Sequence, residues 1–212
     1  MKKFFLVVLM LILSGCATPF IETSTMIYHG PDHLMRGPVI VLPMGENQEN
    51  SLEFQSVKNY LEKKLIEHGY VVAENVQPQY FAFITYGIGD GVTTVSTIPR
   101  YGLTGGGTSH STGTISSSGG ISTYSGTTTA MPTYGVVGSQ TRSRTEYERE
   151  VRIDIWMNDQ QPRKVYEMRG VSPGSCGNLN SVLFAVIDGM FEAFPGESGK
   201  AVKTRVEWHG DC

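Results

Sequence analysis

A long stretch without charge constrains this chain more than any other feature. No Asp, Glu, Lys or Arg occurs from Tyr101 to Thr141, and Gly, Ser and Thr make up most of residues 103–132. Side chains this small and polar bury little apolar surface, so the stretch cannot build a hydrophobic core of its own. The core has to come from the residues on either side.

The two flanks decide whether this stretch separates two domains or is inserted into one. Each flank is expected to hold one helix and a few strands, which is too little to bury a core alone. We therefore expect a single domain over 38–212 with a Gly/Ser/Thr-rich insertion at about 103–132. The near-repeat of IPRYGLTG and MPTYGVVG at its ends is what two paired arms would show. Two alternatives stay open for the insertion, a disordered loop or a β-hairpin arm.

Periodic patterns predict the elements of the flanks. Apolar residues at helical spacing indicate helices at about 51–68 and 178–194, and Asn50 with Glu53 offers a capping box to the first. Apolar or alternating runs indicate strands at 38–43, 70–73, 80–86, 145–157, 163–171 and 201–208. This order predicts an α+β fold, in which a mainly antiparallel sheet has two helices packed on one face.

The N-terminus carries the most specific motif. A basic Met1-Lys2-Lys3 precedes an apolar run too short to span a bilayer, and LSGC follows. These residues resemble the signal peptide and lipobox of bacterial lipoproteins. The resemblance implies a signal peptide over 1–15, cleavage between Gly15 and Cys16, and diacylglycerol and palmitate chains on Cys16.

Lipidation would decide where the chain is held. Each buried methylene contributes about 0.8 kcal/mol, so several acyl chains on one residue give stable membrane anchoring. Residues 16–37 are then expected to form the lipidated N-terminus and a tether. Ala17 stands where aspartate favours inner-membrane retention of such lipoproteins, so we expect the periplasmic face of the outer membrane.

Charge limits the partners that the chain can bind, and cysteine content predicts its covalent links. The formal net charge is −3, and losing the two lysines of the signal peptide would make it −5, which argues against nucleic acid. Cys176 and Cys212 form an even pair in an oxidising compartment, which predicts a disulfide. Two unpaired thiols are the alternative.

Catalytic motifs are missing from the sequence. It contains no Gly-x-Ser-x-Gly, no His-Glu-x-x-His and no cluster of Cys and His. His110 lies between Ser109 and Ser111, but neighbours in a loop lack an orienting third group and a dry pocket. We therefore expect a protein that is not an enzyme and that holds no metal and no cofactor.

Four segments carry a family resemblance. They are SLEFQSVKNYLEKKLIEHGYVV, FAFITYGIGDG, REVRIDIW and DGMFEAFPGESGKAVKTRV. Together they resemble domain-of-unknown-function family 4136, which gathers bacterial envelope lipoproteins. The resemblance implies an envelope lipoprotein but no activity and no catalytic residues.

The expected function is that of an accessory or protein-interaction module in the cell envelope. Its sheet edge or its uncharged insertion would contact an envelope protein. The alternative is a carrier that holds a lipid or a cell-wall fragment between helices and sheet, because aromatic residues are frequent in 81–86 and 184–194.

Overall fold

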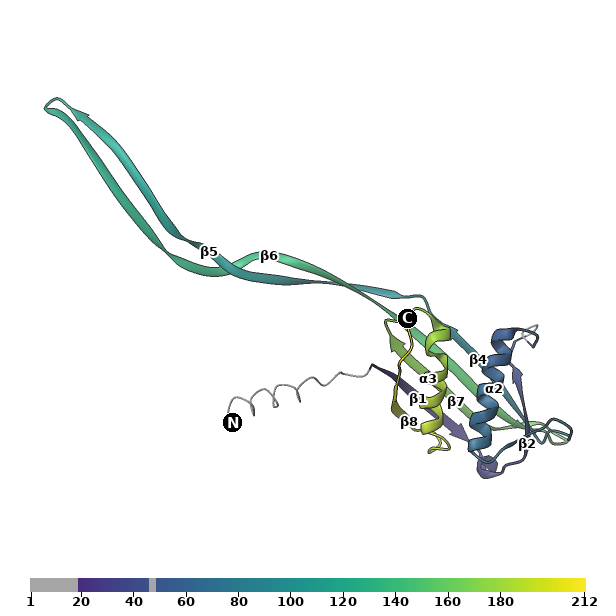
Figure 1. The fold of residues 1–212 in the computed structure, drawn as a ribbon. Coiled ribbons are helices and arrows are strands. Elements are labelled where there is room, and N and C mark those ends of the chain that lie inside the picture. Colours follow the sequence, from purple (N-terminus) through teal and green to yellow (C-terminus); the bar gives the residue numbers. More distant parts are fainter. Residues whose placement is uncertain (1–18, 46–48) are drawn as a thin grey trace, which may run out of the picture. The chain divides into compact units, whose positions relative to one another are not determined.

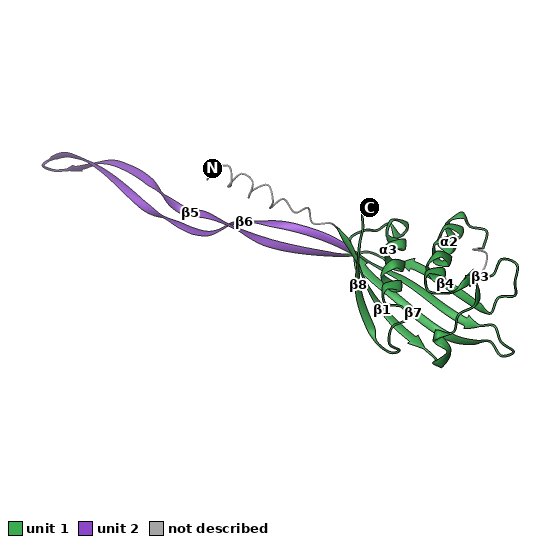
Figure 2. Ribbon diagram, turned by 60° about the horizontal axis from the view of Figure 1, so that its bottom comes forward, with its two compact units in different colours: residues 1–92, 146–212 green, residues 93–145 purple. Residues whose placement is uncertain are grey.

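The computed structural model describes residues 19–45 and 49–212, in two compact units. Gly15 and Cys16 lie outside the described residues. The first unit combines the chain up to Val92 with Glu146–Cys212, and the second is Thr93–Thr145 (Figures 1 and 2). The elements are β1 (Phe20–His29), the 3-10 helix η1 (Pro31–Leu34), β2 (Pro38–Pro43), α2 (Leu52–Glu67), β3 (Val71–Val72), β4 (Tyr80–Ile88), β5 (Val92–Ser117), β6 (Gly120–Met157), β7 (Arg163–Gly174), α3 (Leu179–Glu192) and β8 (Ala201–Glu207).

The first unit is an α+β body built on one twisted sheet. Its strands lie in the order β3-β2-β4-β6-β7-β1-β8. Both helices lie on the same face of this sheet, with α2 over β2 and β3, and α3 over β1, β7 and β8 (Figure 1). The core fills the space between the two layers, and no helix of residues 19–45 and 49–212 covers the other face of the sheet.

The sheet is mixed, whereas the sequence predicts a mainly antiparallel one. β2 runs parallel to β3 on one side and to β4 on the other. The remaining pairs, β4–β6, β6–β7, β7–β1 and β1–β8, are antiparallel. β2 and β3 are parallel because α2 connects them, and a helical crossover leaves the strands that it connects parallel.

The prediction of a tether over residues 16–37 is wrong for residues 20–29, which form β1. This strand lies inside the sheet, with Ile27 opposite Met168 of β7 and Thr23 opposite Thr204 of β8. Alternate residues of β1 are buried: Ile21, Thr23, Thr25 and Ile27. Two of these are threonines, so the apolar alternation that identifies a strand is interrupted in the sequence.

The helices pack through the stripes that the sequence predicts. The buried residues of α2 are Phe54, Val57, Leu61 and Leu65. The buried residues of α3 include Val182, Leu183, Val186, Ile187 and Met190. The predicted cap is displaced by one residue, because the hydroxyl of Ser51 rather than the side chain of Asn50 accepts a hydrogen bond from the Phe54 amide, at 3.4 Å.

Gly189 lets α3 approach the sheet closely. A Cβ at this position would lie 2.8 Å from Oγ1 of Thr204 and 3.1 Å from Cβ of Thr23. The Thr204 hydroxyl donates a hydrogen bond of 2.9 Å to the Gly189 carbonyl. The contact joins α3 to β1 and β8 through small side chains.

The second unit is a two-stranded antiparallel hairpin, which we call the hairpin (residues 93–145). Its strands are β5 and the first part of β6, and its turn is at residues 118–119 (Figure 2). Hydroxyl pairs face each other across it, Thr93 with Thr145 at 2.9 Å and Thr104 with Thr133 at 3.2 Å. The paired region extends well beyond the expected 103–132, and almost all its side chains are exposed.

Candidate interaction surface

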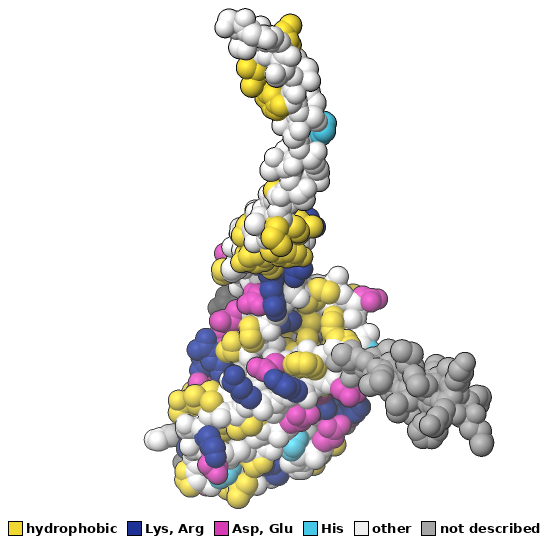
Figure 3. All heavy atoms as spheres, turned by 90° about the vertical axis from the view of Figure 1, so that its left-hand side faces the viewer, with side chains coloured by type: hydrophobic (Ala, Val, Ile, Leu, Met, Phe, Trp, Pro, Cys, Tyr) yellow, Lys and Arg dark blue, Asp and Glu magenta, His cyan; other side chains and the backbone are white. Residues whose placement is uncertain are grey.

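The hairpin exposes large apolar side chains in two bands. The first band combines residues 95–103 of β5 with residues 131–137 of β6, and the second surrounds the turn at residues 115–124. Met131 is 85% exposed, Tyr134 76% and Ile121 75%. The other exposed members are Val95, Ile98, Tyr101, Leu103, Val136 and Val137 in the first band, and Ile115 and Tyr124 in the second. Figure 3 shows apolar side chains gathered toward both ends of the hairpin.

A polar zone separates the two bands. Residues 104–114 and 125–130 carry Gly, Ser and Thr, with His110 and Ala130 as the other residue types. His110 contacts hydroxyls on the opposite strand, with Nδ1 2.9 Å from Oγ1 of Thr127 and Nε2 3.3 Å from Oγ of Ser125. A hollow of about 450 Å³ beside this zone is lined by Thr112, Gly113, Thr114, Thr123, Tyr124 and Ser125.

The two apolar bands were not predicted from the sequence, although the absence of charge in this segment was evident. The apolar residues of β5 and β6 are about 30 positions apart, so their proximity depends on where the turn lies. The near-repeat of IPRYGLTG and MPTYGVVG is the signal that could have found the first band, because it places matching residues on both arms.

Both edges of the hairpin present backbone N–H and C=O groups that can form hydrogen bonds with a further strand. Among the described residues, β5 pairs with β6 alone, and β6 gains further partners only in the body. An isolated two-stranded ribbon is marginally stable in water, and edge strands are usually guarded by charged side chains. From Tyr101 to Thr141 there are none. Such a ribbon can bind by adding a strand to its edge.

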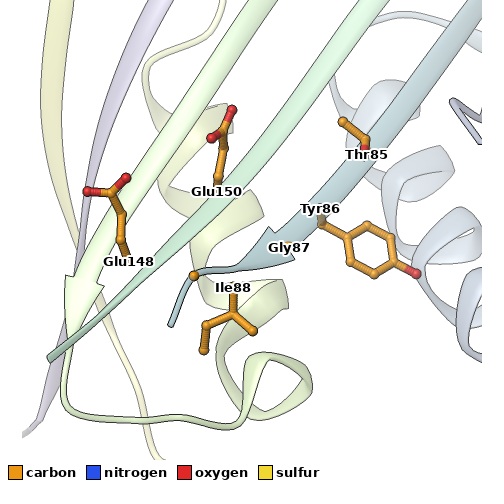
Figure 4. Close-up of a pocket in the computed structure, with 7 residues that line it drawn as sticks. Thr85, Tyr86, Gly87, Ile88, Glu148 and Glu150 are labelled. Atoms are coloured by element: carbon orange, nitrogen blue, oxygen red, sulfur yellow. The ribbon is translucent and has the colours of Figure 1, made fainter. Parts of the chain in front are cut away.

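The body has a hollow of about 390 Å³ where β4 ends beside β6. Glu148 and Glu150 point to one side of β6, while the ring of Tyr86 points away from them (Figure 4). Glu150 is ion-paired with Arg169, whose Nε lies 2.7 Å from Oε1. Burial raises the pKa of Tyr86, and the nearby Glu53 carboxylate adds to the shift. The hollow therefore combines Glu150, which is ion-paired, with Glu148 and with the hydroxyl-bearing residues Thr85 and Tyr86.

Charged side chains on the open face of the sheet form ion pairs between β6 and β7. Asp154, with its side chain 4% exposed, lies 3.2 Å from Nε of Arg152 and 2.8 Å from Nζ of Lys164. Glu167 contacts both cations as well. Burial lowers the pKa of Lys164, but hydrogen bonds to Asp154 and Glu167 outweigh it and raise the pKa overall. Every charge of this cluster is satisfied internally.

The aromatic residues of the carrier alternative are divided between the two faces of the sheet, since Tyr86 and Phe184 pack against the helix-covered core but Phe81 and Phe83 do not. Phe81 and Phe83 alternate along β4 with Ala82 and Ile84, which are buried beneath the helices. The two phenylalanines therefore belong to the opposite face of the sheet. Phe191 packs against Phe194 at 5.6 Å between ring centroids, within the helix-covered core.

The remaining predicted site residues are placed as follows. Cys176 and Cys212 form a disulfide, with their Cα atoms 5.4 Å apart. In the described part of the chain, no three His, Cys, Asp or Glu side chains are grouped as a metal site. Residues 19–45 and 49–212 also include no helix that is both long and apolar enough to cross a bilayer.

Comparison with known proteins gives a family without a described activity. A PDZ domain protein from Parabacteroides distasonis matches at a TM-score of 0.43 and 12% identity, over 89% of this chain and 39% of that chain. The lysenin pore matches at a TM-score of 0.12 and 9% identity, over 91% of this chain and 50% of that chain. This chain thus spans about two fifths of the first protein and half of the second. No curated protein matches the sequence. A domain of unknown function, DUF4136, matches residues 35–196, and the chain therefore belongs to the DUF4136 family.

Proposed function

We propose that this protein is a lipid-anchored lipoprotein on the periplasmic face of the bacterial outer membrane, where it acts as a non-enzymatic interaction module. The hairpin, an insertion in its α+β domain, is the docking element. The observation that carries the proposal is a ribbon with two exposed apolar bands, free edges and no charge from Tyr101 to Thr141. A ribbon of this kind is stabilised by a partner rather than by its own core.

The short distance along the chain from Cys16 to the sheet limits how far a lipid anchor could lie from the body. β1 begins at Phe20, four residues after Cys16. An extended chain spans at most about 3.6 Å per residue, so a lipidated Cys16 would lie within about 14 Å of the sheet. The body would therefore be held at the membrane surface.

Two substitutions test the anchor. Cys16→Ser removes the sulfur that carries the diacylglycerol, and Ser14→Ala serves as the matched control next to the cleavage site. We expect labelled palmitate to enter the parent chain and Ser14→Ala but not Cys16→Ser, which should leave the membrane fraction. Equal labelling of all three chains would disprove lipidation at Cys16.

A shortened hairpin tests the docking role. Thr104 and Thr133 face each other, so residues 104–133 can be replaced by Asn-Gly, a sequence that closes a two-residue hairpin. The body has its own core, and we expect its unfolding transition to be retained. In-cell crosslinking should capture an envelope partner with the parent chain and lose it with the shortened one. Unchanged capture would remove the hairpin from the proposal.

A further inference from the structure

We propose that the hairpin docks onto the hairpin of a second copy of this chain, so that β5 of one copy pairs with β6 of the next in a continued antiparallel sheet. This inference rests on the proposed function and names its partner. The hairpin of a second copy can pair with the free edges and bring the apolar bands of both copies together. Three features of the hairpin lead to it.

The first feature excludes a lipid bilayer as the occupant. A strand that faces lipid presents apolar side chains at alternate positions through the middle of its span. In this hairpin, residues 104–114 and 125–130 form a central zone with no large apolar side chain, and the apolar bands lie on either side. The arrangement is the opposite of a membrane-spanning one. The central zone can offer backbone and hydroxyl hydrogen bonds, which suit a polypeptide strand.

The second feature is that few residues of the hairpin oppose strand addition. Natural edge strands avoid pairing through charges, short length or prolines. β5 and the hairpin part of β6 are long, carry no charge from Tyr101 to Thr141, and contain only Pro99 and Pro132 between residues 93 and 145. Copies that lie side by side would bring no like charges together over this length. Gly, Ser and Thr side chains also allow close approach of neighbouring strands.

The third feature is the match between the two free edges. Since β5 and β6 are antiparallel, a copy in the same orientation places its β6 edge beside the free β5 edge, in the antiparallel sense already used within the hairpin. When the two hairpins pair in register, their first bands lie side by side, and so do their second bands. The contact joins different edges of the two copies, so its repetition gives a closed ring or an open filament.

Mixing two chains that each carry one added cysteine tests this geometry. Thr108 on β5 and Thr129 on β6 each lie four residues closer to the turn than the facing pair Thr104 and Thr133, so they share its register. Both are exposed. We expect purified full-length Thr108→Cys and Thr129→Cys chains to form a mixed disulfide dimer when combined under mild oxidation. Each variant alone should give at least tenfold less dimer. The parent chain, which keeps its native cysteines, sets the background.

A charge tests the same contact without relying on disulfide formation. Thr108→Lys places a cation in the central zone, and Gln160→Lys adds the same charge in the exposed turn between β6 and β7. We expect the parent chain and Gln160→Lys to form oligomers in light scattering, and Thr108→Lys to require at least tenfold more protein to do so. A parent chain that stays monomeric, together with Thr108→Cys and Thr129→Cys chains that form no mixed dimer, would overturn the inference. Capture of a different envelope protein by the hairpin would then leave the proposed function standing, whereas loss of all capture would overturn both.

Discussion

The hydroxyl of Tyr60 on α2 donates a hydrogen bond of 2.7 Å to Oδ1 of Asp188 on α3. Nζ of Lys64, one turn further along α2, lies 2.7 Å from the same oxygen. One carboxylate therefore links the two helices above the core. Asp188 lies on the narrow polar side of an otherwise apolar helix, which gives it a structural role.

Removing this carboxylate should weaken helix packing. We expect Asp188→Ala to lower the free energy of unfolding by about 1–3 kcal/mol, since both the hydrogen bond and the ion pair are lost. Tyr60→Phe should cost about 0.5–1.5 kcal/mol. Urea denaturation measures both, with Glu192→Ala, an exposed acid on the same helix, as the control. An Asp188→Ala chain as stable as Glu192→Ala would contradict the link.

Buried tyrosines should make the fold sensitive to alkali. Burial raises the pKa of Tyr60, and its hydrogen bond to Asp188 adds to the shift; burial also raises the pKa of Tyr166. A pKa raised in the folded state means that the unfolded chain releases its proton first as the pH rises. Stability should therefore be constant below about pH 10 and fall above it. Urea unfolding between pH 8 and 11.5 measures this, and Tyr60→Phe should show a smaller fall. The same fall in both chains would exclude Tyr60 as a contributor.

The disulfide should stabilise the body by restricting the unfolded chain. Cys176 and Cys212 are 36 residues apart, and closing a loop of that length contributes about 2–4 kcal/mol. We expect Cys176→Ser and Cys212→Ser to be destabilised equally, and the double variant no further. Reductant should lower the parent chain to the same stability. A parent chain unaffected by reductant, with two thiols that react without it, would show that the bond is absent in solution.

Local patterns allowed both helices and most strands to be predicted, because one buried face leaves a regular apolar stripe. β1 was missed because two of its four buried residues are threonines. The parallel pairing of β2 was missed because strand order depends on contacts between segments far apart in sequence. The hairpin could be foreseen as an uncharged segment, but its apolar bands become visible only when β5 and β6 are aligned.

A single methyl group at Gly189 should separate α3 from the sheet. The added Cβ would lie 2.8 Å from the Thr204 hydroxyl, and the neighbouring strands leave it little room to move. Overpacking of this kind costs about 1–3 kcal/mol. Gly87→Ala is the control, since a Cβ there meets no atom within 4 Å. Thermal denaturation should show a clear loss for Gly189→Ala and little change for Gly87→Ala. Equal stability would mean that α3 is not held at this distance.

Arg149 is a buried cation at the edge of the core. It is 1% exposed, its Nε donates a hydrogen bond of 2.9 Å to the Ser172 carbonyl, and burial lowers its pKa. A Cβ on Gly174 would lie 2.2 Å from Nη2, so the glycine makes room for the guanidinium. No carboxylate of the described residues forms an ion pair with it. The charge is therefore a cost to the fold, while the long side chain fills space.

Two substitutions separate charge from volume at Arg149. Arg149→Ala leaves a cavity and should lower the free energy of unfolding by about 2–5 kcal/mol. Arg149→Met keeps most of the volume and removes a desolvated charge, which offsets the lost hydrogen bond to Ser172, so we expect a change within about 1 kcal/mol. Guanidinium denaturation of the two variants and the parent chain measures the difference. If methionine is as destabilising as alanine, the charge itself stabilises the fold, and an anion must compensate it.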